Sequence, residues 1–325
     1  MAHLTYVQAI VIGLLQGVTE LFPVSSLGHS ILIPALIGGT WARNLDMAGT
    51  DSPYLAFLVA VHVATAVALV VFYRRDWERI IRGLITSIRH RRVDSPDERL
   101  AWLLIAATIP VGVVGLALEH TIRTVLGRPV PAAVFLILNG GVLFAVERLR
   151  SRTGAAASAA VPVGVVEYRG SARVQVYTTA GSSEGGLHGQ DDAAADARLG
   201  RLGWGEAVGV GAAQILALLP GISRSGATIT AGLVRGLRHD DAARFAFLLA
   251  TPVIAAAGLL KLPELAGPAG HGILGQVVVG SVAAGVAAYV SLRFLTRYFE
   301  TRTLTPFAIY CVAAGVASLA WLALS

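Results

Sequence analysis

Two apolar stretches of the chain contain polar side chains that a lipid bilayer normally excludes. The first reads AIVIGLLQGVTELFPVSSLGHS, from Ala9 to Ser30, and the second reads AVGVGAAQILALLPGISRSGAT, from Ala207 to Thr228. Ionisable groups at membrane depth are costly, and they usually mark a functional site with a partner close by. We therefore expect the chemistry of this protein where these two stretches meet.

The two stretches align with each other. Gly13, Gln16 and Gly28 align with Gly211, Gln214 and Gly226, and the Ser25-Ser26 pair aligns with Ser223 and Ser225 if a slip of one residue is allowed. Short apolar segments broken by Gly and Pro at matching places in two halves of a membrane protein point to a binding site near the membrane midplane.

The first stretch gathers groups suited to nucleophilic attack and proton transfer. Gln16 and Glu20 are four residues apart, so a helix would place them on one face. The Ser25-Ser26 pair follows a proline that ends such a helix, and His29 lies near the start of the helix that returns. A carboxylate, two hydroxyls and an imidazole in one break are components of nucleophilic and acid–base catalysis.

The second stretch contains groups suited to phosphate. Pro220 and Gly221 break the chain directly before the sequence SRSG, so a new helix is predicted to begin there. Backbone N–H groups at a helix start, small hydroxyls and an arginine guanidinium all bind phosphate oxygens. The predicted phosphate ligands are Ser223, Arg224, Ser225, Gly226 and Thr228, together with Ser25 from the first stretch.

Structural roles for the same residues stay open at this point. Glu20 and Arg224 could form only a buried ion pair, and the serines could satisfy backbone groups that the breaks set free. Gln16 and Gln214 occupy matching positions, which favours a structural contact between the two tips. His62 lies in another apolar run and either lines the same cavity or packs within the protein.

The composition is that of a polytopic membrane protein. Hydrophobic residues make up 55% of the chain and charged residues 14%, and the mean hydropathy is +0.67. We predict an all-α fold of about six transmembrane helices plus two re-entrant helix-loop-helix segments formed by the polar stretches. The predicted spans cover residues 54–73, 100–118, 131–147, 245–261, 273–292 and 306–324. The single cysteine excludes an intrachain disulfide.

Basic residues are distributed unevenly between the predicted spans. Of the 26 Lys and Arg residues, 21 fall in the segments 74–99, 148–204, 235–244 and 293–305. Because loops rich in Lys and Arg stay in the cytoplasm, these segments are predicted to be cytoplasmic and both termini external. The same pattern accounts for the net charge of +6 without a nucleic-acid partner. The two halves then run antiparallel, as an inverted repeat.

The chain is predicted to have three parts. Residues 1–150 form a first membrane repeat and residues 204–325 a second, each with a re-entrant segment and three transmembrane helices. Residues 151–203 are rich in Ala, Gly, Ser and Asp, and we expect a polar, mobile cytoplasmic linker there.

The sequences QGVTELFPVSSLGH and LPGISRSGAT resemble the two motifs of the bacterial undecaprenyl-diphosphatase family, the bacitracin-resistance type of integral membrane phosphatase. Supporting similarity extends over DDAARFAFLLATPVI, from Asp240 to Ile254, and more weakly over the C-terminal region around Tyr310. The resemblance implies hydrolysis of undecaprenyl diphosphate to undecaprenyl phosphate, which recycles the lipid carrier for peptidoglycan and confers bacitracin resistance. It also implies a bacterial cell membrane location and a site that faces the extracytoplasmic side.

By position, the resemblance implies roles for four residues. Glu20 matches the essential glutamate, Ser26 the proposed nucleophile, His29 the proposed acid or base, and Arg224 the phosphate-binding arginine. The family also implies a divalent cation, Mg²⁺ or Ca²⁺, for which Glu20 is the candidate ligand. Gln16 stands where some members have a glutamate, which removes one candidate metal ligand. Whether Ser26 or a water attacks stays open.

A second class of function would use the same site. Inverted repeats with broken helices that meet at midplane are also a transporter design, so the protein could move a phosphorylated polyprenyl lipid or a small anion. The combination of Glu, Ser, His and Arg exceeds what anion binding requires and favours the phosphatase. The expected partners are the polyprenyl diphosphate lipid and membrane lipids, and a homodimer stays open.

Overall fold

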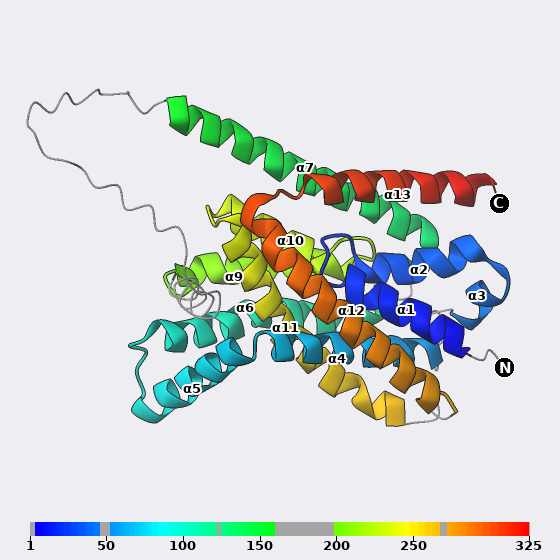
Figure 1. Cartoon of the computed structure of the whole chain (residues 1–325), viewed down its shortest axis with the longest axis horizontal. Coiled ribbons are helices and arrows are strands. Elements are labelled where there is room, and N and C mark those ends of the chain that lie inside the picture. Colours follow the sequence, from blue (N-terminus) through cyan, green and yellow to red (C-terminus); the bar gives the residue numbers. More distant parts are fainter. Residues whose placement is uncertain (1–3, 46–52, 122–124, 160–197, 267–271, 325) are drawn as a thin grey trace, which may run out of the picture.

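The computed structural model describes residues 4–45, 53–121, 125–159, 198–266 and 272–324, and Figure 1 shows their arrangement. All regular elements in these ranges are helices, which confirms the all-α prediction. Six are long and apolar enough to cross a membrane: α4 (Pro53–Phe72), α6 (Pro96–Thr121), α7 (Pro129–Ala159), α11 (His239–Ala266), α12 (Leu274–Thr301) and α13 (Thr305–Leu324). They coincide with the six predicted spans, and several are longer. The protein is therefore a multi-pass membrane protein.

The two polar stretches form broken helices. α1 (Tyr6–Thr19) and α2 (Ser26–Ile37) make one hairpin, and α9 (Trp204–Ala212), the 3₁₀-helix η2 (Ala213–Leu218) and α10 (Arg224–Val234) make the other. At 1.5 Å per residue, α1 is about 21 Å long, which is less than the ~30 Å hydrocarbon core. Asn44, at the end of the short α3 (Gly39–Asn44), donates to Gln8 of α1 at 3.4 Å. The first hairpin therefore returns to the side from which it enters.

The two hairpins enter from opposite ends of the molecule. In Figure 1, α1 starts at the end where both termini lie, and α9 starts at the other end. Their tips meet in the centre, where the Gly221 N–H donates to Ser25 Oγ at 3.1 Å. Gly221 has a φ of +111°, and a Cβ there would fall 2.3 Å from the Ala132 carbonyl oxygen. Only glycine fits here, where the second tip packs closely against α7.

Helix packing follows the predicted inverted repeat. α1 packs on α12 and α9 packs on α6, and in the same way α4 packs on α12 and α11 packs on α6. α4 and α11 contact each other, as do α7 and α13, the last helices of the two halves. The corresponding helices of the two halves are α1 and α9, α4 and α11, α6 and α12, and α7 and α13. When each helix is replaced by its counterpart, every one of these contacts becomes another of them or stays the same. The repeat seen in the sequence is therefore also a repeat of packing.

Glycines at matching positions allow the closest of these contacts. A Cβ on Gly13 would fall 2.3 Å from the Gly280 carbonyl oxygen of α12, and a Cβ on Gly211 would fall 2.1 Å from the Ala107 carbonyl oxygen of α6. Since no side chain fits at these distances, glycine lets the short helices of each hairpin approach the long helix beside them.

α5 (Arg74–His90) fills most of the segment between the first two spans. It carries exposed apolar side chains at Ile81, Ile85 and Ile88, which recur at helical spacing, among arginines. An apolar stripe beside basic residues is typical of a helix that lies in the membrane interface.

The predicted boundaries of the three parts differ in detail from the helices. α7 continues beyond residue 150 to Ala159, because the segment that follows is rich in alanine, which favours helix. At the other end of the predicted linker, Leu199 and Leu202 are buried, and Arg198 forms hydrogen bonds of 3.0 and 2.7 Å to Asp241. The rest of the predicted linker, residues 160–197, lies outside the described residues.

Candidate active site

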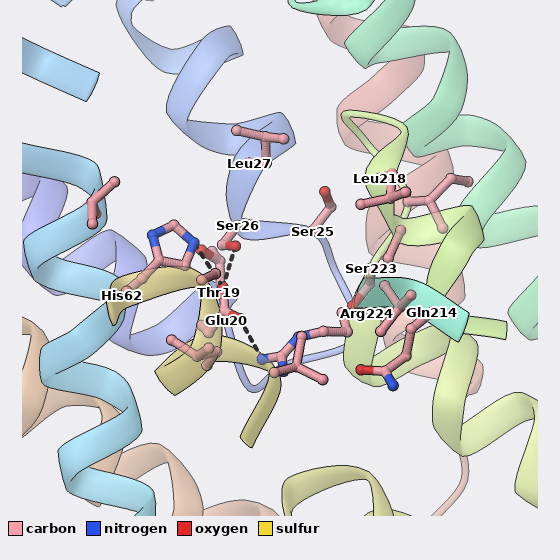
Figure 2. Close-up of a pocket in the computed structure, with 18 of the residues that line it drawn as sticks. Thr19, Glu20, Ser25, Ser26, Leu27, His62, Gln214, Leu218, Ser223 and Arg224 are labelled. Carbon is pink, nitrogen blue, oxygen red and sulfur yellow. Dashed lines mark hydrogen bonds and ion pairs between the residues drawn. The ribbon is translucent and has the colours of Figure 1, made fainter. Parts of the chain in front are cut away.

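Glu20 lies where the two hairpin tips meet, directly after α1, and only 7% of its surface is exposed. Its Oε2 accepts hydrogen bonds from Ser26 Oγ and from Gln16 Nε2 at 2.9 Å. Its Oε1 forms a 2.5 Å ion pair with Arg224 Nη2. His62 Nε2 of α4 lies 3.4 Å from Oε2, and Figure 2 shows this cluster. One carboxylate therefore joins both hairpins and a transmembrane helix.

Two helix caps place the groups that bind Glu20. Ser25 is the N-cap of α2 and Ser223 is the N-cap of α10, and the Oγ of each accepts a hydrogen bond from the backbone N–H three residues later. Ser26 and Arg224 are therefore the first residues of their helices, at the positive ends of the helix dipoles.

The structure corrects the alignment of the two stretches at this point. With a slip of one residue, the sequence paired Ser26 with Ser225. Because the N-caps Ser25 and Ser223 match, Ser26 instead matches Arg224. Equivalent positions of the two repeats thus carry a hydroxyl and a guanidinium, which bind the two oxygens of the same carboxylate.

A cavity of about 300 Å³ opens beside Glu20. Its polar lining consists of Thr19, Glu20, Ser25, Ser26, His62, Gln214, Ser223 and Arg224, with Lys261 at one end. The remaining wall is apolar and includes Leu27, Val59, Val111, Leu218 and Ile254. A mostly apolar cavity with a few convergent polar groups suits an amphiphilic ligand with a charged head.

The cavity leads toward the end of the molecule that carries both termini. Lys261 lies in the C-terminal part of α11, which precedes α12. Near the start of α12, Gln276 donates to the Leu4 carbonyl oxygen at 3.1 Å, so this end lies beside the start of the chain. The part of the cavity lining that includes Lys261 therefore lies toward the end of the molecule that carries the termini.

Arg224 is held from two sides. Its Nη1 donates to the Ala250 carbonyl oxygen of α11 at 3.0 Å while its Nη2 binds Glu20. The side chain is 15% exposed and lines the cavity. Because a guanidinium has five N–H donors in a fixed plane, the oriented group can also bind phosphate oxygens.

Only part of the predicted phosphate site reaches the cavity. Ser223 lines it, but Ser225 Oγ donates to the Phe22 carbonyl oxygen at 3.1 Å and Thr228 Oγ1 donates to the Arg224 carbonyl oxygen at 2.8 Å. Gly226 packs against Pro23, where a Cβ would come within 3.2 Å. None of these last three residues lines the cavity: Ser225 and Gly226 contact the first tip, and Thr228 bonds within its own helix.

His29 is directed away from Glu20. Its Nδ1 lies 2.6 Å from the Ser25 carbonyl oxygen, and its Nε2 lies 2.8 Å from the Tyr310 hydroxyl of α13. The two rings are stacked with centroids 5.7 Å apart. Since a carbonyl can only accept, Nδ1 carries the proton and Nε2 accepts from Tyr310. His29 therefore lies beside Ser25, the N-cap of α2, and it does not line the cavity.

The matched glutamines do not contact each other. Gln16 donates to Glu20, and Gln214 donates to the Gly211 carbonyl oxygen at 3.3 Å within its own hairpin. The expectation of a contact between the tips through these side chains is wrong, because each amide is used inside its own segment.

An amide that does bridge the two tips is that of Asn139 in α7. Its Nδ2 donates to the Pro23 carbonyl oxygen at 3.0 Å, and its Oδ1 accepts from the Ser223 N–H at 3.1 Å. The side chain is 3% exposed. Sequence reasoning missed this residue, although a lone amide in an apolar span is the signal that could have identified it.

Comparison with known proteins is consistent with this geometry. Residues 9–317 match the family described as bacitracin resistance protein BacA. The chain belongs to this family. It is 60% identical to proteins named undecaprenyl-diphosphatase from Mycolicibacterium paratuberculosis and from Mycobacterium avium, over 99% of both chains in each case. It is 56% identical to undecaprenyl-diphosphatase 2 of Frankia alni, over 97% of both chains.

The divalent cation that the BacA resemblance implies would find few protein ligands. Within the described ranges, no group of three or more His, Cys, Asp and Glu side chains could hold a metal. Glu20 supplies carboxylate oxygens, and the neighbouring Gln16 Oε1 is buried without a hydrogen-bond partner among the residues described. Mg²⁺ is usually bound by one or two carboxylates plus substrate phosphates and waters, whereas Ca²⁺ takes six to eight oxygens. This pair fits Mg²⁺ better than Ca²⁺.

Proposed function

We propose that this protein removes the terminal phosphate of undecaprenyl diphosphate and leaves undecaprenyl phosphate. The observation that carries the proposal is the Glu20 carboxylate, which Ser26 binds from one hairpin tip and Arg224 from the other. This arrangement combines a hydroxyl next to a base with a phosphate-binding guanidinium, beside an apolar wall suited to a lipid. The name undecaprenyl-diphosphatase, borne by relatives 60% identical over nearly the whole chain, supports the substrate.

Ser26 is the proposed nucleophile. Its hydroxyl donates to Glu20, which can take the proton as Ser26 Oγ attacks the terminal phosphorus. The bond between this phosphorus and the bridging oxygen breaks, and undecaprenyl phosphate leaves. A water then attacks the phosphoserine and gives its proton to Glu20. Glu20 returns a proton to the departing Ser26 Oγ, so inorganic phosphate leaves with the Ser26 hydroxyl and the Glu20 carboxylate both restored.

His62 is the proposed proton donor to the leaving lipid phosphate. The ring lies between two groups that only accept hydrogen bonds, since the Leu58 carbonyl oxygen is 2.7 Å from Nδ1 and Glu20 Oε2 is 3.4 Å from Nε2. It is therefore oriented to donate from Nε2 into the site, and it can recover a proton from Glu20. His29 is assigned to positioning the cap of α2, because its Nδ1–H binds the Ser25 carbonyl oxygen.

The negative charge of the diphosphate is met by several groups at one point. Arg224, the Ser223 hydroxyl and the N-terminal ends of α2 and α10 all lie near the cavity. A Mg²⁺ ion held by Glu20 and Gln16 together with phosphate oxygens would neutralise further charge on the leaving group. The transition state of phosphoryl transfer needs positioning and charge neutralisation most of all.

We place the protein in the bacterial cell membrane with the mouth of the cavity on the extracytoplasmic side. The segments rich in arginine lie at the end opposite the termini and the Lys261 end of the cavity, and such segments stay in the cytoplasm. In this position the enzyme would recycle the lipid carrier released outside the membrane and so confer bacitracin resistance.

Phosphate release from undecaprenyl diphosphate by purified variants tests the proposal. We expect Ser26→Ala, Glu20→Gln and Arg224→Gln each to lower kcat by about a hundredfold or more, because each removes a nucleophile, a base or a charge-stabilising donor. Acid-quenched wild-type enzyme should yield phosphoserine at Ser26. Ser318→Ala is the matched control, since its hydroxyl donates to the Ala314 carbonyl oxygen within α13 and lies outside the cavity, and it should stay within a few-fold of wild type. Wild-type turnover by Ser26→Ala would contradict the assigned nucleophile.

A further inference from the structure

A second charged cavity lies at the opposite end of the molecule. It has a volume of about 800 Å³ and is lined by the end of α4 and the residues that follow it, by Arg198, by the start of α11 and by the end of α12. Five arginines and four carboxylates face it. We call it the arginine cavity. None of its lining residues belongs to the site around Glu20.

Most charges in the arginine cavity are paired inside it. Arg198 binds Asp241 at 2.7 Å, and Arg238 binds Asp240 at 3.1 Å. A third pair, between Arg244 and Asp76, has a separation of 2.9 Å. These pairs account for three of the five arginines and three of the four carboxylates. The wall formed by the end of α12 supplies the remaining groups.

Arg293 and Arg297 provide the excess positive charge. They lie one turn apart on α12, both are exposed, and neither has an ion-pair partner among the residues that the structure describes. The one carboxylate left over, Glu300, is exposed on the same helix. The net character of this wall is therefore positive, and two guanidiniums at this spacing can bind one phosphate group.

An apolar groove adjoins the arginine cavity. It has a volume of about 550 Å³, lies between α4 and α12, and is lined by residues such as Val67, Val71 and Val286. Tyr289 lines both the groove and the cavity, and its ring makes an edge contact with Phe72 at 5.6 Å. The groove and the cavity thus form one continuous surface with an apolar and a basic part.

The position of this surface along the membrane normal matches its division into an apolar part and a basic part. α12 has 28 residues and is about 42 Å long, which exceeds the ~30 Å hydrocarbon core by about two turns. Arg293 and Arg297 lie in the last turns, whereas Val282 and Val286, both about 60% exposed, lie about two to three turns before Arg293, within the core. A lipid beside α12 would therefore have its head at the arginines and its chain in the groove.

We propose that the arginine cavity and the apolar groove together bind one anionic phospholipid of the cytoplasmic leaflet, with its phosphate at Arg293 and Arg297 and one acyl chain between α4 and α12. Charge complementarity selects the head group, because the excess charge of the cavity is positive and lies at the end rich in arginine. This binding is separate from the phosphatase chemistry, since the two cavities share no residue.

Native mass spectrometry of the full-length protein, stripped of lipid and titrated with phosphatidylglycerol or phosphatidylcholine, tests this inference. We expect tight binding of one phosphatidylglycerol and weak binding of phosphatidylcholine. The double variant R293Q/R297Q should weaken the phosphatidylglycerol complex about thirtyfold, from roughly one kcal/mol per basic residue. Val286→Trp should also weaken it, because the indole fills the groove. Phosphate release by both variants should remain at the wild-type level.

A second double variant distinguishes a built site from general attraction. R89Q/R235Q removes the same charge from exposed arginines that line neither the groove nor the cavity, and it should bind phosphatidylglycerol as wild type does. If both double variants bound phosphatidylglycerol equally weakly, the proposal would be overturned, because the lipid would then be held by diffuse attraction to the positive charge of this end of the molecule. Lipid that remains bound when the protein is purified, before stripping, provides a second check. The proposal would also be overturned if undecaprenyl phosphate, but not excess phosphatidylglycerol, displaced this lipid, because the occupant would then be the reaction product.

Discussion

At the scale of single residues, the site depends on the sharing of one carboxylate. Glu20 follows directly on the C-terminal end of α1, where the helix dipole disfavours a negative charge. Arg224, Ser26 and Gln16 offset this cost by binding its two oxygens. The same bonds keep Ser26, the proposed nucleophile, beside the proposed base before any substrate arrives, which is the preorganisation that makes charge stabilisation effective in catalysis.

His62 provides a prediction at this scale. Replacement of His62 by Gln keeps a hydrogen-bonding side chain but removes the proton donor, so we expect kcat for phosphate release to fall about a hundredfold with a small change in KM. Steady-state kinetics with undecaprenyl diphosphate measure both constants.

His239→Gln is the control for this prediction. His239 lies at the other end of the molecule, where its Nε2 contacts Glu147 at 2.7 Å, so its loss should leave both constants near wild type. If His62→Gln changed only KM, the side chain would bind substrate without transferring a proton.

At the scale of elements, the sequence predicts the helices well and the side-chain directions less well. The spans follow from apolar runs of sufficient length, and Pro23 and the Pro220-Gly221 pair mark the breaks. His29 could not be placed in the same way, because its direction depends on α13, which supplies Tyr310 from 281 residues away in the chain. Contacts between distant elements decide such orientations, and a single sequence does not contain them.

The glycine contacts between elements give a second prediction. Gly211→Ala would place a methyl group 2.1 Å from the Ala107 carbonyl oxygen, so α9 and α6 must separate. We expect a loss of stability of about 1–3 kcal/mol, the usual cost of overpacking, seen as a lower midpoint of thermal unfolding in detergent.

Gly112→Ala in α6 is the matched control. Among the residues described, no neighbouring element comes within 4 Å of the position that its methyl group would take. Alanine also favours helix over glycine, so stability should stay equal or rise slightly. Equal destabilisation by both substitutions would show that the close packing of α9 on α6 is not what Gly211 provides.

At the scale of the whole molecule, the two halves of the inverted repeat contribute different side chains to the site. Two hairpins of the same design meet tip to tip, and equivalent first turns carry Ser26 in one and Arg224 in the other. The sequence indicated the repeat and the charge asymmetry, and together they predicted that the tips meet. It did not indicate which residues become equivalent, because the slip at the prolines can be resolved only when the N-caps are seen in space.

The orientation of the whole molecule gives the last prediction. Cys311 is fully buried, so cysteines introduced elsewhere can be labelled without replacing it. Arg43 and Arg89 are both exposed, the first near the termini and the second on α5 at the arginine-rich end. With a membrane-impermeant maleimide, Arg43→Cys should react in right-side-out vesicles and Arg89→Cys only in inverted ones. Wild-type protein, which should not react in either preparation, is the control. The reverse pattern would place the cavity beside Glu20 on the cytoplasmic side and contradict the proposed recycling of a lipid carrier from outside.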